Sequence, residues 1–332
     1  MSMSNASHTE VSIEPSANIN GGKPEGKIGK YFKELKKDIF RDRILYYLLI
    51  PFLLWFLVFK YLPMWGIQIA FKDFSLFKGI GGSKWVGFEY FTEFIGSEYF
   101  LRVFKNTVII SLYGLIICFP AQIILDIMIS EVTRQGFKKV VQTLTYLPHF
   151  VSVVVIAGIV TTFLSPDSGL INLMLEKLGF EKIYFLTNPD YFRGIYTIMN
   201  LWKETGFASI VFIAAIAGID TQLYEAAKMD GANRWHQLRH ITIPAIKSTI
   251  VVLFILRLGT FLDSGFEQIF LMLNSLNNQV GDVFDTYVYE IGILQGQFSY
   301  SAAVGLFKSA VALILVIGAD RIAKKLGEDG II

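Results

Sequence analysis

The chain has 332 residues, of which 53% are hydrophobic and 15% aromatic, and its formal net charge is +2. Its mean hydropathy of +0.49 excludes an ordinary water-soluble globule of this length and predicts that the bilayer is its solvent. The near-neutral charge does not indicate a nucleic-acid partner. Cys118 is the single cysteine, which excludes an internal disulfide, and the four histidines are too scattered to predict a metal site.

The N-terminal part of the chain precedes the membrane domain. Residues 1–27 are rich in Ser, Asn, Gly and Glu and lack an apolar pattern, which predicts a disordered cytoplasmic tail. Residues 28–43 form a basic cytoplasmic or interfacial segment that leads into the first long apolar run. That run begins near Ile44, too far into the chain and too long for a cleaved signal peptide, so we expect it to remain as a membrane span.

Six apolar runs are long enough to cross a bilayer. About 20 apolar residues, each rising about 1.5 Å along a helix, cross a hydrocarbon layer of about 30 Å. The runs are 44–62, 107–130, 140–164, 195–219, 248–273 and 301–322. We therefore predict an all-α, polytopic membrane domain of six transmembrane helices over residues 44–322, followed by a cytoplasmic tail, 323–332. Pro120 and Pro148 fall inside spans, where we expect packing kinks rather than gates.

The distribution of basic residues predicts the orientation. If the N-terminus is cytoplasmic, 18 Lys and Arg residues fall in the inner segments, which are 1–43, 131–139, 220–247 and the tail from Arg321. Eight then fall in the outer segments, which are 63–106, 165–194 and 274–300. Because cytoplasmic loops carry the excess of basic residues, we expect both termini on the cytoplasmic side.

Residues 220–247 are the most informative segment between two spans. Their sequence, DTQLYEAAKMDGANRWHQLRHITIPAIK, is too polar to cross a membrane. One helical stripe precedes Gly231 and a second follows it, which predicts a helix, a glycine turn and a helix. Pro244 sets where the next transmembrane helix begins. Two interpretations fit this pattern: a helix pair that transmits force from a soluble motor, and a structural cap between two spans.

The same segment carries a family motif. Its order Glu225-Ala226-Ala227, three residues, Gly231, nine residues, Ile241-Thr242-Ile243-Pro244 resembles the EAA loop of binding-protein-dependent ABC importer permeases. The usual pattern is E-A-A-x3-G-x9-I-x-L-P, and Ile243 stands at the usual Leu, a conservative change. Three further segments resemble the carbohydrate branch of these permeases, in particular LplB-like permeases of the MalF/UgpA type: NLWKETGFASIVFIAAIAGID, SGLINLMLEKLGF and FDTYVYEIGILQGQFSYSAAVGLFKS. The resemblance covers residues 40–330.

The resemblance implies the type I ABC importer permease fold and a set of partners. These are a second homologous permease, two cytoplasmic ATPase subunits that bind ATP and Mg, and an extracytoplasmic solute-binding protein, all at the cell membrane of a prokaryote. The motif residues Glu225, Ala226, Ala227, Gly231, Ile241 and Pro244 would then form a coupling helix seated on one ATPase. Because the chain lacks a G-x4-G-K-[S/T] phosphate loop, we expect a transport subunit that binds no cofactor itself, rather than an enzyme.

Polar residues in the fifth span predict a substrate pathway, because polar side chains at membrane depth usually face a cavity or the bundle interior. On a continuous helix, Arg257, Ser264 and Gln268 fall within a stripe of about 40°, and Thr260 and Glu267 flank it. This face offers donors and acceptors to sugar hydroxyls. An ion pair of Arg257 with Glu267 or Asp263 that holds the bundle together is the competing interpretation.

Two aromatic residues complete the predicted pathway. Phe261 and Trp202 offer apolar ring surface for a pyranose, and Trp202 equally fits an interfacial anchor at a helix end. We expect import of an oligosaccharide or polysaccharide fragment. Basic residues in the outer segments favour an acidic, uronate-type substrate, but acidic residues there offset them and neutral sugars stay open. The alternative function is an ion-coupled secondary sugar carrier, which usually carries inverted repeats that we do not find here.

Overall fold

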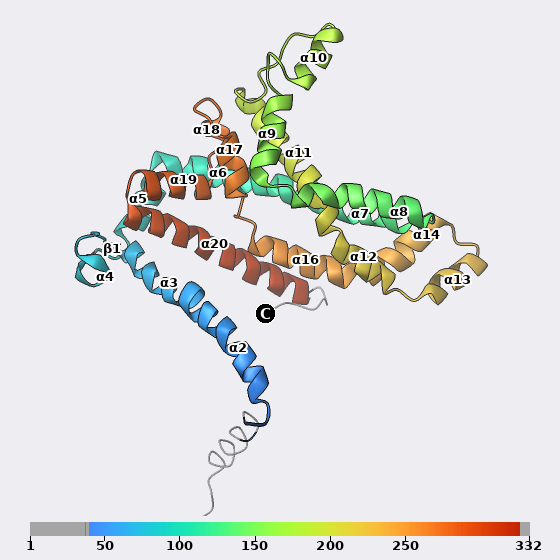
Figure 1. Cartoon of the computed structure of the whole chain (residues 1–332), viewed down its shortest axis with the longest axis horizontal. Helices are drawn as coiled ribbons and strands as arrows, with labels where there is room; N and C mark the ends of the chain where they lie inside the picture. The colour runs from blue at the N-terminus through green and yellow to red at the C-terminus, as the bar shows by residue number, and fades with distance from the viewer. Residues whose placement is uncertain (1–36, 38–39, 326–332) are drawn as a thin grey trace, which may run out of the picture. The chain divides into compact units, whose positions relative to one another are not determined.

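The computed structural model describes residue 37 and residues 40–325 of the chain (Figure 1). The chain divides into two compact units, Met1–Trp65 and Gly66–Ile332. The predicted N-terminal tail lies outside the described residues, as do residues 28–36, 38 and 39 of the basic segment and the last seven residues of the predicted C-terminal tail, 326–332.

The first unit contains the first predicted span. Its elements are α2 (Arg43–Phe56), the π-helical turn η1 (Leu57–Tyr61) and α3 (Leu62–Met64). The helical stretch runs on through the 3-10 helix η2 (Trp65–Phe71), so that Arg43–Phe71 is 29 residues long. Its length and its apolar composition are sufficient for a membrane span.

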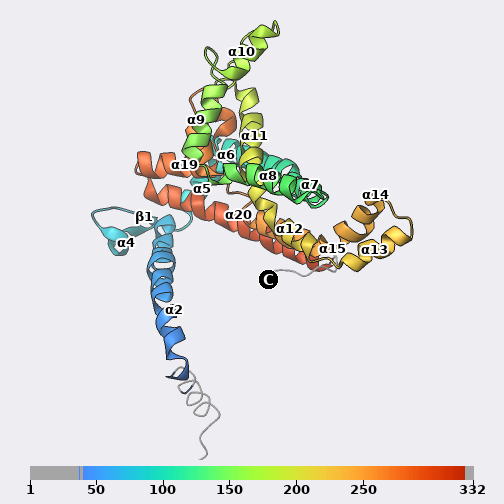
Figure 2. The same cartoon turned by 45° about the vertical axis from the view of Figure 1, so that its right-hand side comes forward.

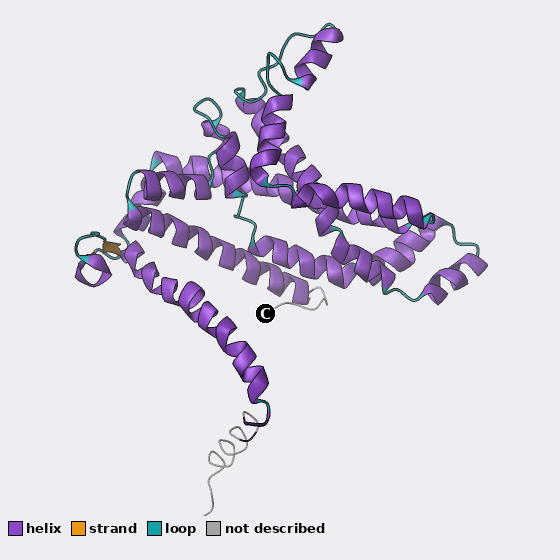
Figure 3. Ribbon diagram, in the orientation of Figure 1, coloured by secondary structure: helices purple, strands orange, loops and turns teal. Residues whose placement is uncertain are grey.

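The second unit opens with a small ordered outer segment. A two-residue strand, β1 (Lys72–Asp73), pairs antiparallel with β2 (Lys84–Trp85), with Lys72 opposite Trp85. Two short helices accompany the hairpin, α4 (Gly79–Gly82) and α5 (Glu89–Gly96). The Phe71 and Trp85 rings stack with centroids 5.8 Å apart, and this contact packs the hairpin against the end of η2. Apart from this hairpin, the described elements are helical, and Figure 3 shows the predicted all-α class.

Two spans of the second unit are continuous helices. One consists of α6 (Glu98–Tyr113), the π-helical turn η3 (Gly114–Cys118) and α7 (Phe119–Ser130). The other is α20 (Phe298–Lys325). Both are longer than their predicted apolar runs, and α20 continues three residues past Ile322, into the predicted C-terminal tail. Pro120 lies in α7 just after the π-helical turn η3, and the helix continues through it.

The other spans are bent pairs of helices. They bend by 100° between Gln135–Phe150 and Val153–Phe163, by 67° between Pro189–Ala217 and Thr221–Met229, and by 57° between Arg234–Ala245 and Lys247–Gly259. The described part of the chain thus has three helices long enough to span a membrane, or up to six if each bent pair is one span. The elements of these pairs are α8 (Gln135–Tyr146), η4 (Leu147–Phe150), α9 (Val153–Phe163), α11 (Pro189–Ala208), α12 (Ile210–Ala217), α13 (Thr221–Met229), α14 (Arg234–Gln237), η5 (Leu238–Thr242), α15 (Ile243–Ala245) and α16 (Lys247–Gly259).

Two predicted spans are wrong in their continuity. We expected a kinked helix through Pro148, but the chain leaves the helix at Val151 and restarts only where the Ser152 hydroxyl caps α9. We also expected one helix over 248–273, but α16 ends at Gly259 and the next helix, α17 (Phe266–Met272), begins after an irregular stretch. Gly265 precedes α17 with φ +71, a conformation that glycine adopts without strain.

Short helices complete the outer side. They are α10 (Leu170–Lys177), α18 (Asn278–Gly281), α19 (Phe284–Tyr289) and the π-helical turn η6 (Glu290–Leu294). One buried cluster, which includes Ile110, Tyr196 and Ile269, joins α6, α11 and α17. A second, centred on Phe94 and Phe284, joins α5, α6, α19 and α20. Figure 2 places α13 and α14 together at the end of this unit that lies away from α5 and α19.

Candidate functional site

The 220–247 segment is built from local signals that the sequence carries. The Asp220 side chain accepts a hydrogen bond from the Gln222 N–H at 2.9 Å and starts α13. The helix ends at Gly231, whose φ of +79 lets the Ala232 N–H turn back to the Ala227 carbonyl at 2.8 Å. An added Cβ at Gly231 would meet nothing within 4 Å, so the backbone conformation, and not space, requires glycine.

A second helix returns along the first. The Asn233 side chain caps α14 by accepting from the His236 N–H at 2.9 Å. The Tyr224 and Thr242 hydroxyl oxygens lie 2.9 Å apart, and this hydrogen bond fixes α13 against η5. The outcome is a helix, a glycine turn and a helix, in the order that the sequence predicted.

The motif residues divide between the surface and the helix contact. Glu225, Ala226 and Gly231 are exposed, whereas Ala227 and Ile241 are half-buried between the helices. Large apolar side chains are also exposed on this segment: Leu223 (53%), Met229 (88%) and Trp235 (65%). The helix pair therefore presents a mixed apolar and polar surface that its own fold leaves uncovered.

The prediction for Pro244 is wrong by three residues. We expected it to open the next transmembrane helix, but it lies inside the three-residue α15, which continues from η5. The chain bends at Ile246, and α16 begins at Lys247. The change of direction therefore comes two residues after Pro244.

A polar seam lies where the fifth span breaks. The Tyr196 hydroxyl of α11 donates to the Ser264 carbonyl, and it lies 3.5 Å from the Gln268 side-chain oxygen. The Ser264 and Ser111 hydroxyls are also 3.5 Å apart, at the limit of a hydrogen bond. Ser264 and Gln268 are buried, at 4% and 8% exposure. The irregular backbone of the break thus finds its partners on α11 and α6.

The predicted polar stripe of five residues does not form one face. It assumed a continuous helix, whereas Arg257 belongs to α16, Ser264 to the break and Gln268 to α17. Arg257, Phe261 and Ser264 nevertheless line one small cleft together with Ser111 and Asn200. The remaining pair is elsewhere: Thr260 is exposed and donates to the Arg257 carbonyl at 3.2 Å, and Glu267 is exposed in the first turn of α17.

An ion cluster that the sequence did not reveal replaces the expected pairing of Arg257. Lys308 of α20 lies 2.5 Å from a carboxylate oxygen of Asp263 and 2.5 Å from one of Asp285. The Lys308 side chain is 13% exposed. One ammonium group therefore joins the break of the fifth span to α19 and to the sixth span. The signal in the sequence was a lone lysine within an apolar run, which gives no indication of its partners.

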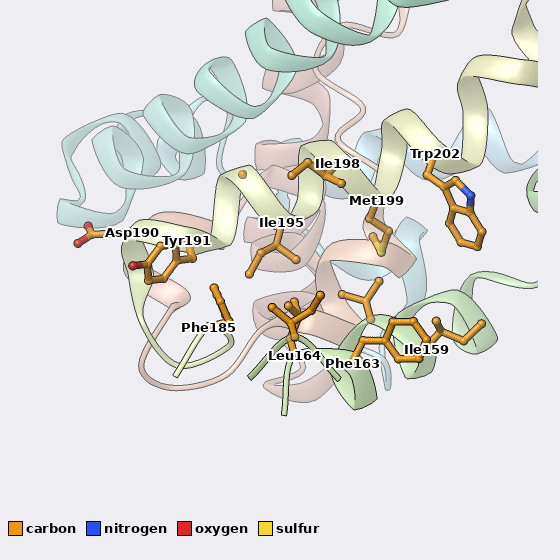
Figure 4. Close-up of a pocket in the computed structure, with 13 residues that line it drawn as sticks. Ile159, Phe163, Leu164, Phe185, Asp190, Tyr191, Ile195, Ile198, Met199 and Trp202 are labelled. Carbon is orange, nitrogen blue, oxygen red and sulfur yellow. The ribbon is translucent and has the colours of Figure 1, made fainter. Parts of the chain in front are cut away.

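Trp202 does not join Phe261 in the predicted pathway. It lines a separate apolar cleft of about 590 Å³ between α9 and α11, and Figure 4 shows it across that cleft from Ile159 and Phe163. The residues that follow it form a further charged group that sequence reasoning did not assemble. Lys203 pairs with Glu204, and the other Glu204 oxygen lies 2.9 Å from the His149 ring nitrogen.

Comparison with known proteins identifies the family. Residues 119–328 match the model of the binding-protein-dependent transport system inner membrane component family. The chain belongs to this family. Protein LplB of Bacillus subtilis (strain 168) is 51% identical over 88% of this chain and 92% of its own length. The polygalacturonan/rhamnogalacturonan transport system permease protein YteP of the same organism is 50% identical over 90% of this chain and 93% of its own length.

A solved structure shows the same fold. The match is to the crystal structure of a bacterial ABC transporter involved in the import of the acidic polysaccharide alginate, at 44% identity and a TM-score of 0.82. It covers 88% of this chain and 99% of that chain. The present chain is therefore an ABC importer permease with the type I fold, and it is a membrane transport component rather than an enzyme. Family membership also replaces the alternative of an ion-coupled secondary carrier.

Proposed function

We propose that this chain is the permease through which an ATP-driven importer moves an oligosaccharide or polysaccharide fragment of acidic, uronate type. The relatives support this substrate class, because one is a polygalacturonan/rhamnogalacturonan permease and another belongs to an alginate importer. Both share more than two fifths of their residues with this chain, over nearly its whole membrane domain.

The proposed complex has four further protein subunits. A second homologous permease completes the pathway, two ATPase subunits bind ATP and Mg on the cytoplasmic side, and a solute-binding protein delivers the sugar from outside, at the cell membrane of a prokaryote. A related transporter has been solved in complex with an alginate pentasaccharide-bound periplasmic protein, which supports this delivery route. The chain itself needs no cofactor in this proposal.

The observation that carries the coupling proposal is the helix pair of α13 and α14. Its ends are fixed by Asp220, Gly231 and Asn233, so it is a rigid projection and not a slack loop. Its surface exposes Met229 and Trp235 to a degree that an isolated soluble surface seldom does. We assign this surface, including Glu225 and Ala226, to a groove on one ATPase, and the same segment leads directly through α15 into the fifth span.

The substrate pathway is placed at the polar seam. Arg257, Phe261 and Ser264 line one cleft, so a guanidinium, an aromatic ring and a hydroxyl face the same space. This combination suits a sugar, which offers hydroxyl groups around an apolar ring face. The cleft measures only about 20 Å³ in this state, so transport of a sugar through it requires the helices to move apart. Gln268 belongs to the seam and lies four residues after Ser264, in α17. Thr260 and Glu267 are exposed residues on either side of the seam in sequence. Trp202 lies on the neighbouring apolar cleft.

The coupling proposal is tested with Gly231→Asp and Gly231→Asn in the purified complex. Asn and Asp both tolerate positive φ better than other non-glycine residues, and they differ here mainly in charge. We expect the Asp variant to assemble and to accept the loaded binding protein, but to lose sugar uptake, whereas the Asn variant keeps a substantial part. Normal uptake by assembled Gly231→Asp complexes would overturn the coupling role.

The pathway proposal is tested separately with Gln268→Ala. Removal of the amide takes away one polar group at the seam, so apparent affinity or preference among sugars should change in complexes whose assembly and melting temperature are measured alongside. The measurement is uptake of a set of labelled oligosaccharides by reconstituted complexes. An unchanged order of preference with unchanged half-saturating concentrations contradicts a role for this residue.

A further inference from the structure

A cleft of about 740 Å³ opens on the outer side of the second unit. It is lined by five residues of α6, by Arg193 of α11 and by Gln279 and Val280 of α18; the α6 residues are Leu101, Arg102, Phe104, Lys105 and Asn106. All of these residues fall in the outer segments that flank the predicted spans. Three of these eight residues are cationic, which distinguishes this cleft from the one beside Trp202, whose lining has no cation.

Arg193 is held in place by neutral groups. Its Nη2 donates to the Asn106 side-chain oxygen at 2.8 Å, and its Nε donates to the Val280 carbonyl at 3.3 Å. The Asn106 amide in turn donates to the Gln279 and Asp282 carbonyls at 3.0 Å each. Asn106 itself is 2% exposed. The guanidinium is therefore pre-positioned by a buried amide, and its positive charge is not neutralised by these contacts.

The third cation of the cleft is already paired. Arg102 lies 3.0 Å from a carboxylate oxygen of Asp282, and the Thr286 hydroxyl donates to the other oxygen at 2.8 Å. Burial raises the pKa of the Asp282 carboxyl, and the bonds from Thr286 and Arg102 oppose that shift. In contrast, neither Lys105 nor Arg193 makes an ion pair with any residue in the range 40–325. The cleft therefore has an unneutralised charge of about two.

A neighbouring cleft shows the opposite electrostatics. It shares Arg102 but is lined by Glu93 and Glu290, together with Tyr99, Tyr287 and amide side chains. An anion that approaches the outer surface is thus repelled by the cleft with Glu93 and Glu290 and attracted to the cleft with Lys105 and Arg193. The Nε of Arg102 is buried without a hydrogen-bond partner among the described residues. It is therefore an unused donor on a residue that lines both clefts.

The basic cleft and the small cleft of the proposed pathway are lined from the same face of α11. Arg193 and Asn200 are seven residues apart on α11, so they lie on the same face about two turns, or about 10 Å, from one another. Asn200 lines the small cleft with Arg257 and Ser264. A chain of sugar residues that occupies both clefts would follow α11 inward from its outer end.

We propose that Lys105 and Arg193 form an outer subsite for a carboxylate of a uronate residue in the transported saccharide. This inference rests on the proposed function and adds to it the group that is recognised and the residues that recognise it. The planar guanidinium matches the two oxygens of a carboxylate, and the lysine adds a second charge from the facing helix. The subsite holds the acidic residue outside the membrane while the next sugar residues enter the seam.

The test uses the assembled importer with its binding protein, reconstituted in vesicles of zwitterionic lipid. The probes are uronate trisaccharides of the galacturonate and alginate types and the same trisaccharides with their carboxyl groups reduced. The variants are Arg193→Gln and Lys105→Gln. Two control variants are added. Arg193→Lys keeps the positive charge but lacks the two parallel N–H donors of a guanidinium, and Lys177→Gln removes an equal charge from α10 in the same outer region. Complex assembly and melting temperature are measured for each variant.

We expect Arg193→Gln and Lys105→Gln each to raise the half-saturating concentration of the acidic trisaccharide about tenfold, because each removes a charge-assisted contact. Uptake of the reduced trisaccharide should change less than twofold, and Arg193→Lys should fall between. Lys177→Gln should resemble the unaltered protein. Equal losses for acidic and reduced probes, or no loss for either, would overturn the subsite.

Two further outcomes separate the alternatives. If acidic uptake is unaffected while co-purifying anionic phospholipid is lost from the Arg193→Gln complex, the cleft is a lipid site and the proposal is wrong. If the unaltered importer moves no trisaccharide at all, the proposed function is wrong, and the subsite that rests on it is rejected with it. Transport of both probes by the unaltered importer, with no selective effect of the variants, rejects the subsite alone.

Discussion

The 220–247 segment and the seam at the break of the fifth span are both polar, but they are held in different ways. The segment is fixed by its own neighbours in sequence: Asp220 and Asn233 cap two helices, and Gly231 turns the chain between them. The seam is fixed by residues far apart in sequence, because Tyr196 of α11 satisfies the backbone of Ser264. The first region is exposed and the second buried.

This difference predicts where substitutions act. Exposed residues of the segment contribute little to the folded state, so changes there should alter transport and leave stability nearly intact. Residues of the seam and of its ion cluster are part of the packed interior, so changes there should lower stability first. The four expectations below run from the largest stability effect to the smallest.

Lys308→Met should have the largest effect, because it leaves Asp263 and Asp285 close together without their shared cation. We expect a loss of about 2–3 kcal/mol, less than for a fully buried pair because Asp263 is 60% exposed. The check is the melting temperature of the purified complex in detergent. Lys308→Arg should keep most of the stability, and Asp285→Asn added to Lys308→Met should restore part of it. A melting temperature equal to that of the unaltered protein would contradict the cluster's role.

Gly206→Ala tests close packing at the third and fourth spans. A Cβ added at Gly206 of α11 would collide with the Thr145 carbonyl of α8, so the two helices must move apart. We expect a loss of about 1–3 kcal/mol from overpacking. Gly194→Ala on the same helix is the matched control, since a Cβ there meets nothing within 4 Å. The measurement is the melting temperature of both variants. Equal melting temperatures would contradict the close contact at Gly206.

Tyr196→Phe isolates the hydrogen bond at the seam. It removes the hydroxyl that donates to the Ser264 carbonyl and keeps the ring, which is 3% exposed. We expect a loss of about 1–2 kcal/mol, because the buried carbonyl then lacks its partner. The control is Tyr191→Phe at a 38% exposed position of the same helix. If both variants melt alike, the break in the fifth span is satisfied by other groups.

Arg234→Gln should have the smallest effect. Its exposed ion pair with Glu131, at 3.2 Å, links the 220–247 segment to the turn after α7. Both side chains are largely solvated, so we expect the free energy of unfolding to change by no more than about 0.5 kcal/mol. A drop in melting temperature as large as that of Tyr196→Phe would erase the distinction between the two regions.

The sequence predicted the all-α class and the location of the apolar runs because apolar length is a local property. It also predicted the helix pair around Gly231, since caps and glycine turns are encoded by adjacent residues. The break at Gly265 was missed because glycine and threonine are common inside membrane helices, and only contacts from α11 show that the chain unwinds there. The predicted stripe of Arg257, Ser264 and Gln268 was lost for the same reason, because it assumed a continuous helix.

The Lys308 cluster and the basic outer cleft depend on three-dimensional neighbours. Lys308 is 23 residues from Asp285 and farther from Asp263, and no spacing rule relates them. Arg193 and Asn106 are 87 residues apart. The basic residues of the outer segments were visible in the sequence, but the acidic residues near them appeared to cancel their charge. In the structure, Lys105 and Arg193 line one cleft, Glu93 and Glu290 line another, and Arg102 lines both.

The long helix Glu98–Ser130 has a further consequence for the outer surface. At 33 residues it measures about 50 Å, whereas the hydrocarbon layer is about 30 Å thick. If it stands upright, about 20 Å must rise beyond the lipid tails, shared between its two ends. Its first turns therefore project beyond the lipid tails and hold the exposed Lys105 in water, where a charged side chain needs no partner to be stable. An outer cation can then be exchanged for another residue without any penalty for membrane insertion.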